Sequence, residues 1–246
     1  MSTIGFIGAG NMAQALIKGI TEASVFKAEH VFISDIKKER LDLLKKEYGV
    51  TVAESNMQLA GEVDTLILSV KPQHFFYVLN EIKDAVKTDV LVISIAAGIT
   101  IKNISDILGD MAVIRVMPNT PALIGQGASA LCANDKAKPM IDDAMKIFSA
   151  VGKAVIIDDE DLMDAVTAVS GSGPAYYFML MEEMVKAALS LGLDEKVATD
   201  LVLQTAKGAS LLATKSPDSP SVLRQKVTSP GGTTEAALKI FSENKI

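Results

Sequence analysis

The stretch TIGFIGAGNMAQALIKGI, residues 3–20, decides the fold. Its first five residues predict a short buried strand, and Gly8, Gly10 and Ala13 then form the pattern G-x-G-x-x-A at the start of a helix. In this context the first glycine makes a tight turn, the second lets a pyrophosphate approach the backbone, and the helix N-terminus supplies N–H groups and a positive dipole. Residues 3–20 therefore predict a dinucleotide-binding βαβ unit.

The alternation of short β-branched runs with segments of helical period continues to about Ile157. Such alternation is typical of βαβ units around a mostly parallel sheet. The expected strands cover residues 3–7, 31–34, 64–70, 90–95, 112–117, 129–132 and 154–157. We therefore expect an α/β fold with a doubly wound Rossmann domain over residues 1–159.

After Asp158 the chain is rich in Ala, Leu and Met at helical spacing, which predicts an all-α domain over residues 160–246. Caps are expected at Asp159 or Asp161, at Ser172 and at Asp194, with a short helix over 221–227 and a last helix after residue 232. The helix from Ser172 to about residue 191 is apolar almost all round. This pattern fits a core helix of one subunit, and it favours more strongly burial in a homodimer interface.

Composition excludes several classes of protein. The 246 residues carry a net charge of −6 without a basic cluster, which argues against nucleic acid as a partner. Cys132 is the single cysteine, and no His, Cys and carboxylate cluster has the spacing of metal ligands, so we expect a reducing compartment and no metal. No basic leader precedes Thr3, and the longest apolar run, 90–101, is too short to span a membrane. We expect a soluble cytoplasmic protein.

Candidate cofactor contacts follow the strands of the predicted sheet. Asp35 ends the second strand, where a carboxylate would bind the ribose 2′-hydroxyl of NADH and repel the 2′-phosphate of NADPH. Ser34 and the nearby Lys37, Lys38 and Arg40 would instead favour that phosphate, so the sequence leaves NADPH or NADH open. The predicted cofactor-binding set is Ile7, Gly8, Ala9, Gly10, Asn11, Met12, Ser34, Asp35, Lys37, Asn56, Ser69, Val70, Lys71, Pro72, Ala97, Gly98 and Asn119.

The segment VTSPGGTTEAAL, residues 227–238, predicts a sharp loop followed by a helix. Main-chain N–H groups of Gly232, Thr233 and Thr234 would point outward from the helix start and receive a carboxylate. The hydroxyls of Ser229 and Thr234 would bind that carboxylate or a ring nitrogen. Alone, the pattern fits an ordinary capped helix equally well. Beside a dinucleotide site it favours a substrate loop, because a dehydrogenase needs a second site facing the nicotinamide.

Six segments together resemble the pyrroline-5-carboxylate reductase family: GFIGAGNMAQALIKG (5–19), SVKP (69–72), AAGI (96–99), RVMPNTP (115–121), AVSGSGPAYYF (168–178) and VTSPGGTTEAAL. The resemblance implies reduction of 1-pyrroline-5-carboxylate to L-proline by NADPH or NADH, the last step of proline biosynthesis. It implies homodimers that often assemble into a larger ring. It also implies Thr234 as the catalytic residue near the ring nitrogen, within a substrate-binding set of Glu160, Ser229, Gly231, Gly232, Thr233 and Thr234.

Two other functions fit parts of the sequence. One is a hydroxyacid dehydrogenase or another imine reductase, for which Lys186 or Lys207 would be the catalytic lysine. The other is a non-enzymatic sensor that binds a dinucleotide and regulates a partner. Activity with pyrroline-5-carboxylate, with a hydroxyacid and with neither separates the three.

Overall fold

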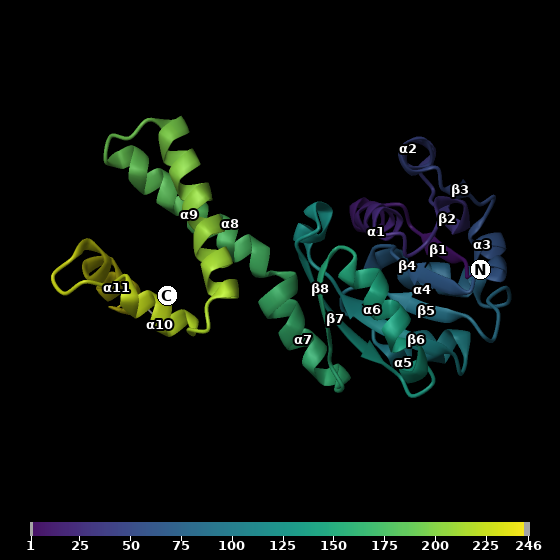
Figure 1. The fold of residues 1–246 in the computed structure, drawn as a ribbon. Coiled ribbons are helices and arrows are strands. Elements are labelled where there is room, and N and C mark those ends of the chain that lie inside the picture. The colour runs from purple at the N-terminus through teal and green to yellow at the C-terminus, as the bar shows by residue number, and fades with distance from the viewer. Residues whose placement is uncertain (1, 244–246) are drawn as a thin grey trace. The chain divides into compact units, whose positions relative to one another are not determined.

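Eight strands form one sheet within residues 2–243, the part of the chain that the computed structural model describes (Figure 1). Their order is β3-β2-β1-β4-β5-β6-β7-β8, and the pairs are parallel except β6 with β7. The strands are β1 (Ile4–Ile7), β2 (Val31–Ser34), β3 (Thr51–Val52), β4 (Thr65–Leu68), β5 (Leu91–Ser94), β6 (Ala112–Met117), β7 (Gly127–Ala133) and β8 (Gly152–Ile156). This doubly wound sheet confirms the predicted fold class. The sequence missed β3, because two residues at a sheet edge are too few to show a pattern.

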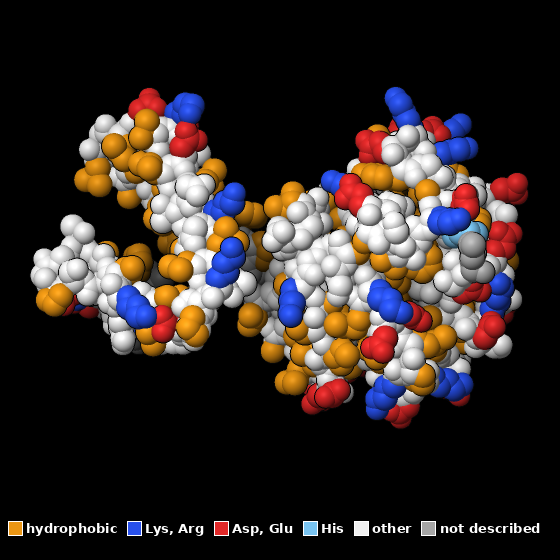
Figure 2. Space-filling model, viewed as in Figure 1, with side chains coloured by type: hydrophobic (Ala, Val, Ile, Leu, Met, Phe, Trp, Pro, Cys, Tyr) orange, Lys and Arg blue, Asp and Glu red, His pale blue; other side chains and the backbone are white. Residues whose placement is uncertain are grey.

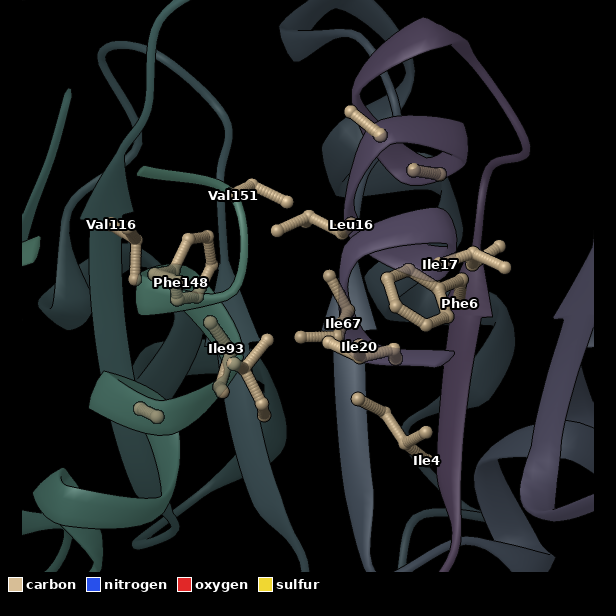
Figure 3. Close-up of a cluster of buried hydrophobic side chains, with 14 of the residues drawn as sticks. Ile4, Phe6, Leu16, Ile17, Ile20, Ile67, Ile93, Val116, Phe148 and Val151 are labelled. Atoms are coloured by element: carbon tan, nitrogen blue, oxygen red, sulfur yellow. The ribbon is translucent and has the colours of Figure 1, made fainter. Parts of the chain in front are cut away.

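Successive residues of a strand point to opposite faces of the sheet, so the apolar strands need cover on both faces. Helices provide this cover on each face. Ile67 of β4 lies in one hydrophobic cluster with residues of α1 and α6, including Leu16 and Phe148 (Figure 3). Its neighbours Leu66 and Leu68 lie in a second cluster with residues of α3, α4 and α5. The helices are α1 (Asn11–Glu22), α2 (Lys38–Tyr48), α3 (Asn56–Glu62), α4 (Pro72–Ile82), α5 (Ile101–Leu108) and α6 (Ile141–Ser149).

Helix α1 buries one face against the sheet, with Leu16, Gly19 and Ile20 inside. Gly19 is needed there, since a Cβ at this position would lie 2.4 Å from Cγ1 of Val151. Helix α2 ends at Gly49, which has a left-handed φ of 72°. Close packing at Gly19 therefore positions α1, and the left-handed Gly49 ends α2.

Residues 160–175 pack on the sheet before the chain leaves it. They form a 3-10 turn (Glu160–Leu162), α7 (Met163–Val166) and a π-helix (Thr167–Gly171), and Met163 is fully buried beside Ala130 and Cys132. Asp159 caps the turn through the N–H of Asp161, as predicted. The predicted cap at Ser172 is wrong. Its backbone is helical, with φ −83° and ψ −20°, so the chain passes from the π-helix into α8 without the extended residue that a cap requires.

Contacts divide the chain into two units, Met1–Ala175 and Tyr176–Ile246. The second unit contains most of α8 (Gly173–Ser190), and α9 (Glu195–Lys215), α10 (Pro220–Lys226) and α11 (Thr233–Glu243). Asp194 caps α9 by accepting N–H groups of Lys196 and Val197, as predicted. The domain boundary expected between residues 159 and 160 stays a prediction.

The helical unit exposes many apolar side chains, which appear orange in Figure 2. On α8, Tyr177, Phe178 and Met179 are each about three-fifths exposed (63%, 60% and 63%). Exposed apolar surface of this extent is typical of a protein interface. Within residues 2–243, no helix has the length and apolar character to cross a membrane.

Candidate functional site

The glycine loop between β1 and α1 has the geometry of a phosphate-binding turn. Gly8 has φ +97°, and a Cβ there would lie 2.8 Å from the carbonyl oxygen of Ser69, so a side chain is excluded. Gly10 is the N-cap of α1 and has no cap from a side chain, and a Cβ added to it would meet nothing within 4 Å. The N–H groups at the start of α1 therefore face open space, which suits an anion.

Asp35 holds the glycine loop from the end of β2. Its carboxylate accepts the N–H of Ala9 at 2.6 Å and the N–H of Lys37 at 2.8 Å. Arg40 donates from Nε to the carbonyl oxygen of Ala9 at 2.9 Å and from Nη2 to Gln14 at 2.9 Å. The carboxylate and the guanidinium thus hold the two peptide groups on either side of Ala9. The end of β2 thus has a carboxylate, Asp35, which suits the ribose of NADH, and a guanidinium, Arg40, which suits the 2′-phosphate of NADPH. The choice between NADPH and NADH therefore stays open.

Three further predicted polar residues support this edge. Ser34 donates its hydroxyl to Oδ1 of Asn56 at 2.7 Å, and Nδ2 of Asn56 donates to Glu81 at 2.8 Å. Ser69 donates its hydroxyl to the carbonyl oxygens of Ile7 and Gly8. These bonds tie the ends of β1, β2 and β4 together. Glu81 was missed in the sequence, where nothing connects it to the end of β2.

The remaining loop residues lie at the same carboxyl edge. Pro72 is the first residue of α4, and the exposed Lys71 is its N-cap. Ala97 and Gly98 are exposed after β5, and Gly98 has φ +74° with open space around it. Since β1, β4 and β5 are neighbours, the structure brings these segments to one edge with the glycine loop. That edge is where doubly wound sheets bind their ligands.

Asn119 and Glu160 have protein partners for their polar atoms. Oδ1 of Asn119 accepts the N–H of Ala128 at 2.8 Å, and its Nδ2 donates to the carbonyl oxygen of Ser170 at 3.1 Å. Oε1 of Glu160 accepts from Nη1 of Arg115 at 3.0 Å and from the N–H of Ile101 at 2.8 Å. Both join elements of the first unit, and their expected contacts with a ligand stay predictions.

The loop before α11 is organised by its own hydrogen bonds. Gly231 has φ +73°, and its N–H donates to Oε2 of Glu235 at 2.8 Å. The N–H of Gly232 donates to the carbonyl oxygen of Ser229 at 3.0 Å, so it does not point outward as the sequence suggested. The N–H groups of Thr233 and Thr234 open α11. Glu235 was missed, although an acidic residue in a first helical turn that reaches back to the preceding loop is a known signal.

One of the two lysines expected of a hydroxyacid dehydrogenase, Lys186, is not placed for acid–base work. Lys186 is exposed and pairs with Glu182 at 2.6 Å and Glu183 at 2.7 Å. These carboxylates raise the pKa of Lys186 well above its usual range, so the amine stays protonated at neutral pH. Among residues 2–243, no group of His, Cys, Asp and Glu side chains has the arrangement of a metal site.

Similarity to known proteins extends over both units. A Pseudomonas aeruginosa protein named pyrroline-5-carboxylate reductase is 47% identical, with 99% of this chain and 90% of the relative covered. The chain belongs to the pyrroline-5-carboxylate reductase family. Residues 160–246 match the family description "Pyrroline-5-carboxylate reductase dimerisation", and residues 3–98 match "NADP oxidoreductase coenzyme F420-dependent".

Solved structures of this reductase family share the fold. A pyrroline-5-carboxylate reductase from Coxiella burnetii has a TM-score of 0.91 at 39% identity, covering 99% of this chain and 91% of the other. A Plasmodium falciparum pyrroline carboxylate reductase with NADP bound has a TM-score of 0.86 at 34% identity, covering 99% and 90%. A Streptomyces aurantiacus imine reductase, at 17% identity and a TM-score of 0.62, is similar in fold alone.

Proposed function

We propose that this chain reduces 1-pyrroline-5-carboxylate to L-proline with NADPH or NADH, the last step of proline biosynthesis. The observation that carries the proposal is a helix start at Gly10 without a side-chain cap, in a chain that is 47% identical to a named reductase over nearly its whole length. An open helix N-terminus suits the pyrophosphate of a dinucleotide. The relative with NADP bound supports the same cofactor class.

The cofactor site would use the carboxyl edge of the sheet. The N–H groups that follow Gly10, at the start of α1, hold the pyrophosphate, and Asp35 meets the adenosine ribose. Ala97 and Gly98 line the nicotinamide end. We assign the rest of the predicted cofactor-binding set to supporting contacts at this edge, with Asn119 acting indirectly.

The substrate would bind at the loop that opens α11. The N–H groups of Thr233 and Thr234 receive its carboxylate, with Ser229 and Gly231 shaping the turn. Bound reduced nicotinamide supplies the hydride. A protonated imine already carries the positive charge that makes its carbon accept hydride, so the main task of the protein is alignment. Thr234 orients the ring nitrogen through its hydroxyl.

We further propose a homodimer formed through residues 160–246, with dimers joining into a larger ring, acting in the cytoplasm. The apolar side chains exposed on α8 and the dimerisation match over the same residues support the dimer. Size measurement in solution by multi-angle light scattering tests it. A monomeric protein at micromolar concentration would contradict this assembly.

Replacement of Thr234 by Ala tests the catalytic assignment. Loss of one oriented donor should lower kcat by about 10- to 100-fold with little change in the Kd of NADPH or NADH. Thr234→Ser, which keeps the hydroxyl, is the matched control and should retain most of the turnover. An unchanged kcat in Thr234→Ala would remove Thr234 from the chemistry.

A further inference from the structure

One side of the β6 chain contacts the segment that leads to the helical unit. Residues two apart in an extended chain point to the same side, and three such residues in succession touch residues 160–171. Arg115 pairs with Glu160 at 3.0 Å, and a Cβ on Gly171 would lie 2.4 Å from Cε of Met117. The third is Asn119, whose backbone is extended at φ −131°. This side of β6 holds the π-helix against the sheet.

The amide of Asn119 is the last of these contacts. It accepts from the N–H of Ala128 on β7 and donates to the carbonyl oxygen of Ser170 in the π-helix. One acceptor and one donor on the same planar group are needed here, and Asn provides both. A carboxylate would keep the first bond and lose the second.

The π-helix is placed where its position matters for a ligand. Strands β5 and β6 are parallel neighbours, with Ser94 beside Arg115, so the loop with Ala97 and Gly98 leaves the sheet at the same edge as Asn119. The N–H of Ser172 closes the π-turn on the carbonyl oxygen of Thr167 at 2.8 Å, and α8 starts at the next residue. Short π-segments inside helices are frequent at functional sites.

We propose that Asn119 is a positioning residue for the reduction: it holds the π-helix Thr167–Gly171 against the carboxyl edge of the sheet and acts without binding the cofactor. The proposal rests on the proposed function for its kinetic consequence. It differs from the expectation that Asn119 contacts the cofactor, because both polar ends of its side chain are used inside the protein.

The variant Asn119→Asp tests this role. It keeps the acceptor for Ala128 and turns a carboxylate oxygen toward the carbonyl of Ser170. Displacement of the π-helix should lower kcat with pyrroline-5-carboxylate by about 10- to 100-fold, the size expected for a misplacement of about 1 Å. The Kd of NADPH, measured by fluorescence titration, should stay within about threefold of the parent. A roughly tenfold weaker Kd with an unchanged kcat would make Asn119 a cofactor contact and overturn the proposal.

Asn134 offers a matched control at the opposite end of β6. Its Nδ2 donates to the carbonyl oxygen of Met111 at 2.8 Å, and its Oδ1 accepts the N–H of Val113 at 3.1 Å. Asn134→Asp should lower Tm as much as Asn119→Asp and leave kcat per folded enzyme within about twofold. Equal effects of the two variants on kcat would reduce Asn119 to a stability role and overturn the proposal.

Hydrogen exchange separates this proposal from the proposed function. Amides 170–172 should exchange faster in Asn119→Asp than in the parent, and at the parent rate in Asn134→Asp. If Asn119→Asp exchanges faster but the parent protein does not reduce pyrroline-5-carboxylate, the contact is supported and the proposed function is refuted. If Asn119→Asp does not fold, Asn119→Ala, which loses both bonds without placing a carboxylate against the carbonyl of Ser170, should show the same kcat loss. Parent-like exchange and kcat in the variant that folds would overturn the proposal.

Discussion

The replacement Glu160→Ala should destabilise the protein by about 3 kcal/mol, because it leaves a buried guanidinium without its main partner. The side chain of Arg115 is only 6% exposed. Breaking a buried ion pair from one side costs about 3–5 kcal/mol. Asp164 lies 3.7 Å from Nη2 of Arg115, but its side chain is 91% exposed, so it compensates only in part and places the loss near the lower end.

Urea unfolding at one fixed protein concentration measures this loss, since the stability of an oligomer depends on concentration. The control is Asp106→Ala, which removes the partner of Lys102 in a pair whose side chains are 79% and 55% exposed, and it should cost less than about 1 kcal/mol. The double variant Arg115→Met with Glu160→Ala should recover much of the stability. A Glu160→Ala loss below about 1 kcal/mol with a raised KM would refute this reasoning and make Glu160 a substrate contact.

Three further substitutions test the cofactor edge and the competing dehydrogenase. Gly8→Ala forces a Cβ to 2.8 Å from the carbonyl of Ser69 at φ +97°, so the affinity for NADPH and NADH should fall at least about tenfold in fluorescence titrations, and parent-like Kd values would contradict this. Asp35→Ser removes a negative charge and should shift the Kd ratio toward NADPH by about tenfold, whereas an unchanged ratio excludes Asp35 from selectivity. Lys186→Met should leave the pH–rate profile unchanged, since carboxylates raise the pKa of Lys186, and loss of a profile limb would favour a catalytic lysine.

Most of the fold follows from local patterns in the sequence. Every run that was predicted as a strand became one, and the runs of β1, β4 and β5 are buried at each residue, as is typical of central strands in a parallel sheet. Asp194 also marks the helix start that it predicts, since capping is local chemistry. The π-helix was not foreseeable. It depends on contacts with Met117 and Asn119, which are about 50 residues away in the chain.

The candidate site was predictable in its location and less so in its contacts. The ends of successive parallel strands must meet at one edge, which places Gly8, Ser69 and Gly98 together. Which polar side chains stay available to a ligand depends on the tertiary structure. In the sequence, Asn119 and Glu160 cannot be told apart from residues that contact a ligand. Each has protein partners that no local pattern reveals.

The most direct test of the whole account follows the absorbance at 340 nm with the purified protein in three assays: NADPH or NADH with 1-pyrroline-5-carboxylate, NADP+ or NAD+ with a hydroxyacid, and the reduced cofactor with no substrate. We expect cofactor oxidation only with the imine, with one L-proline formed for each cofactor consumed. Tight cofactor binding without turnover of the imine, or turnover of the hydroxyacid instead, would contradict the proposed function while leaving the dinucleotide fold intact.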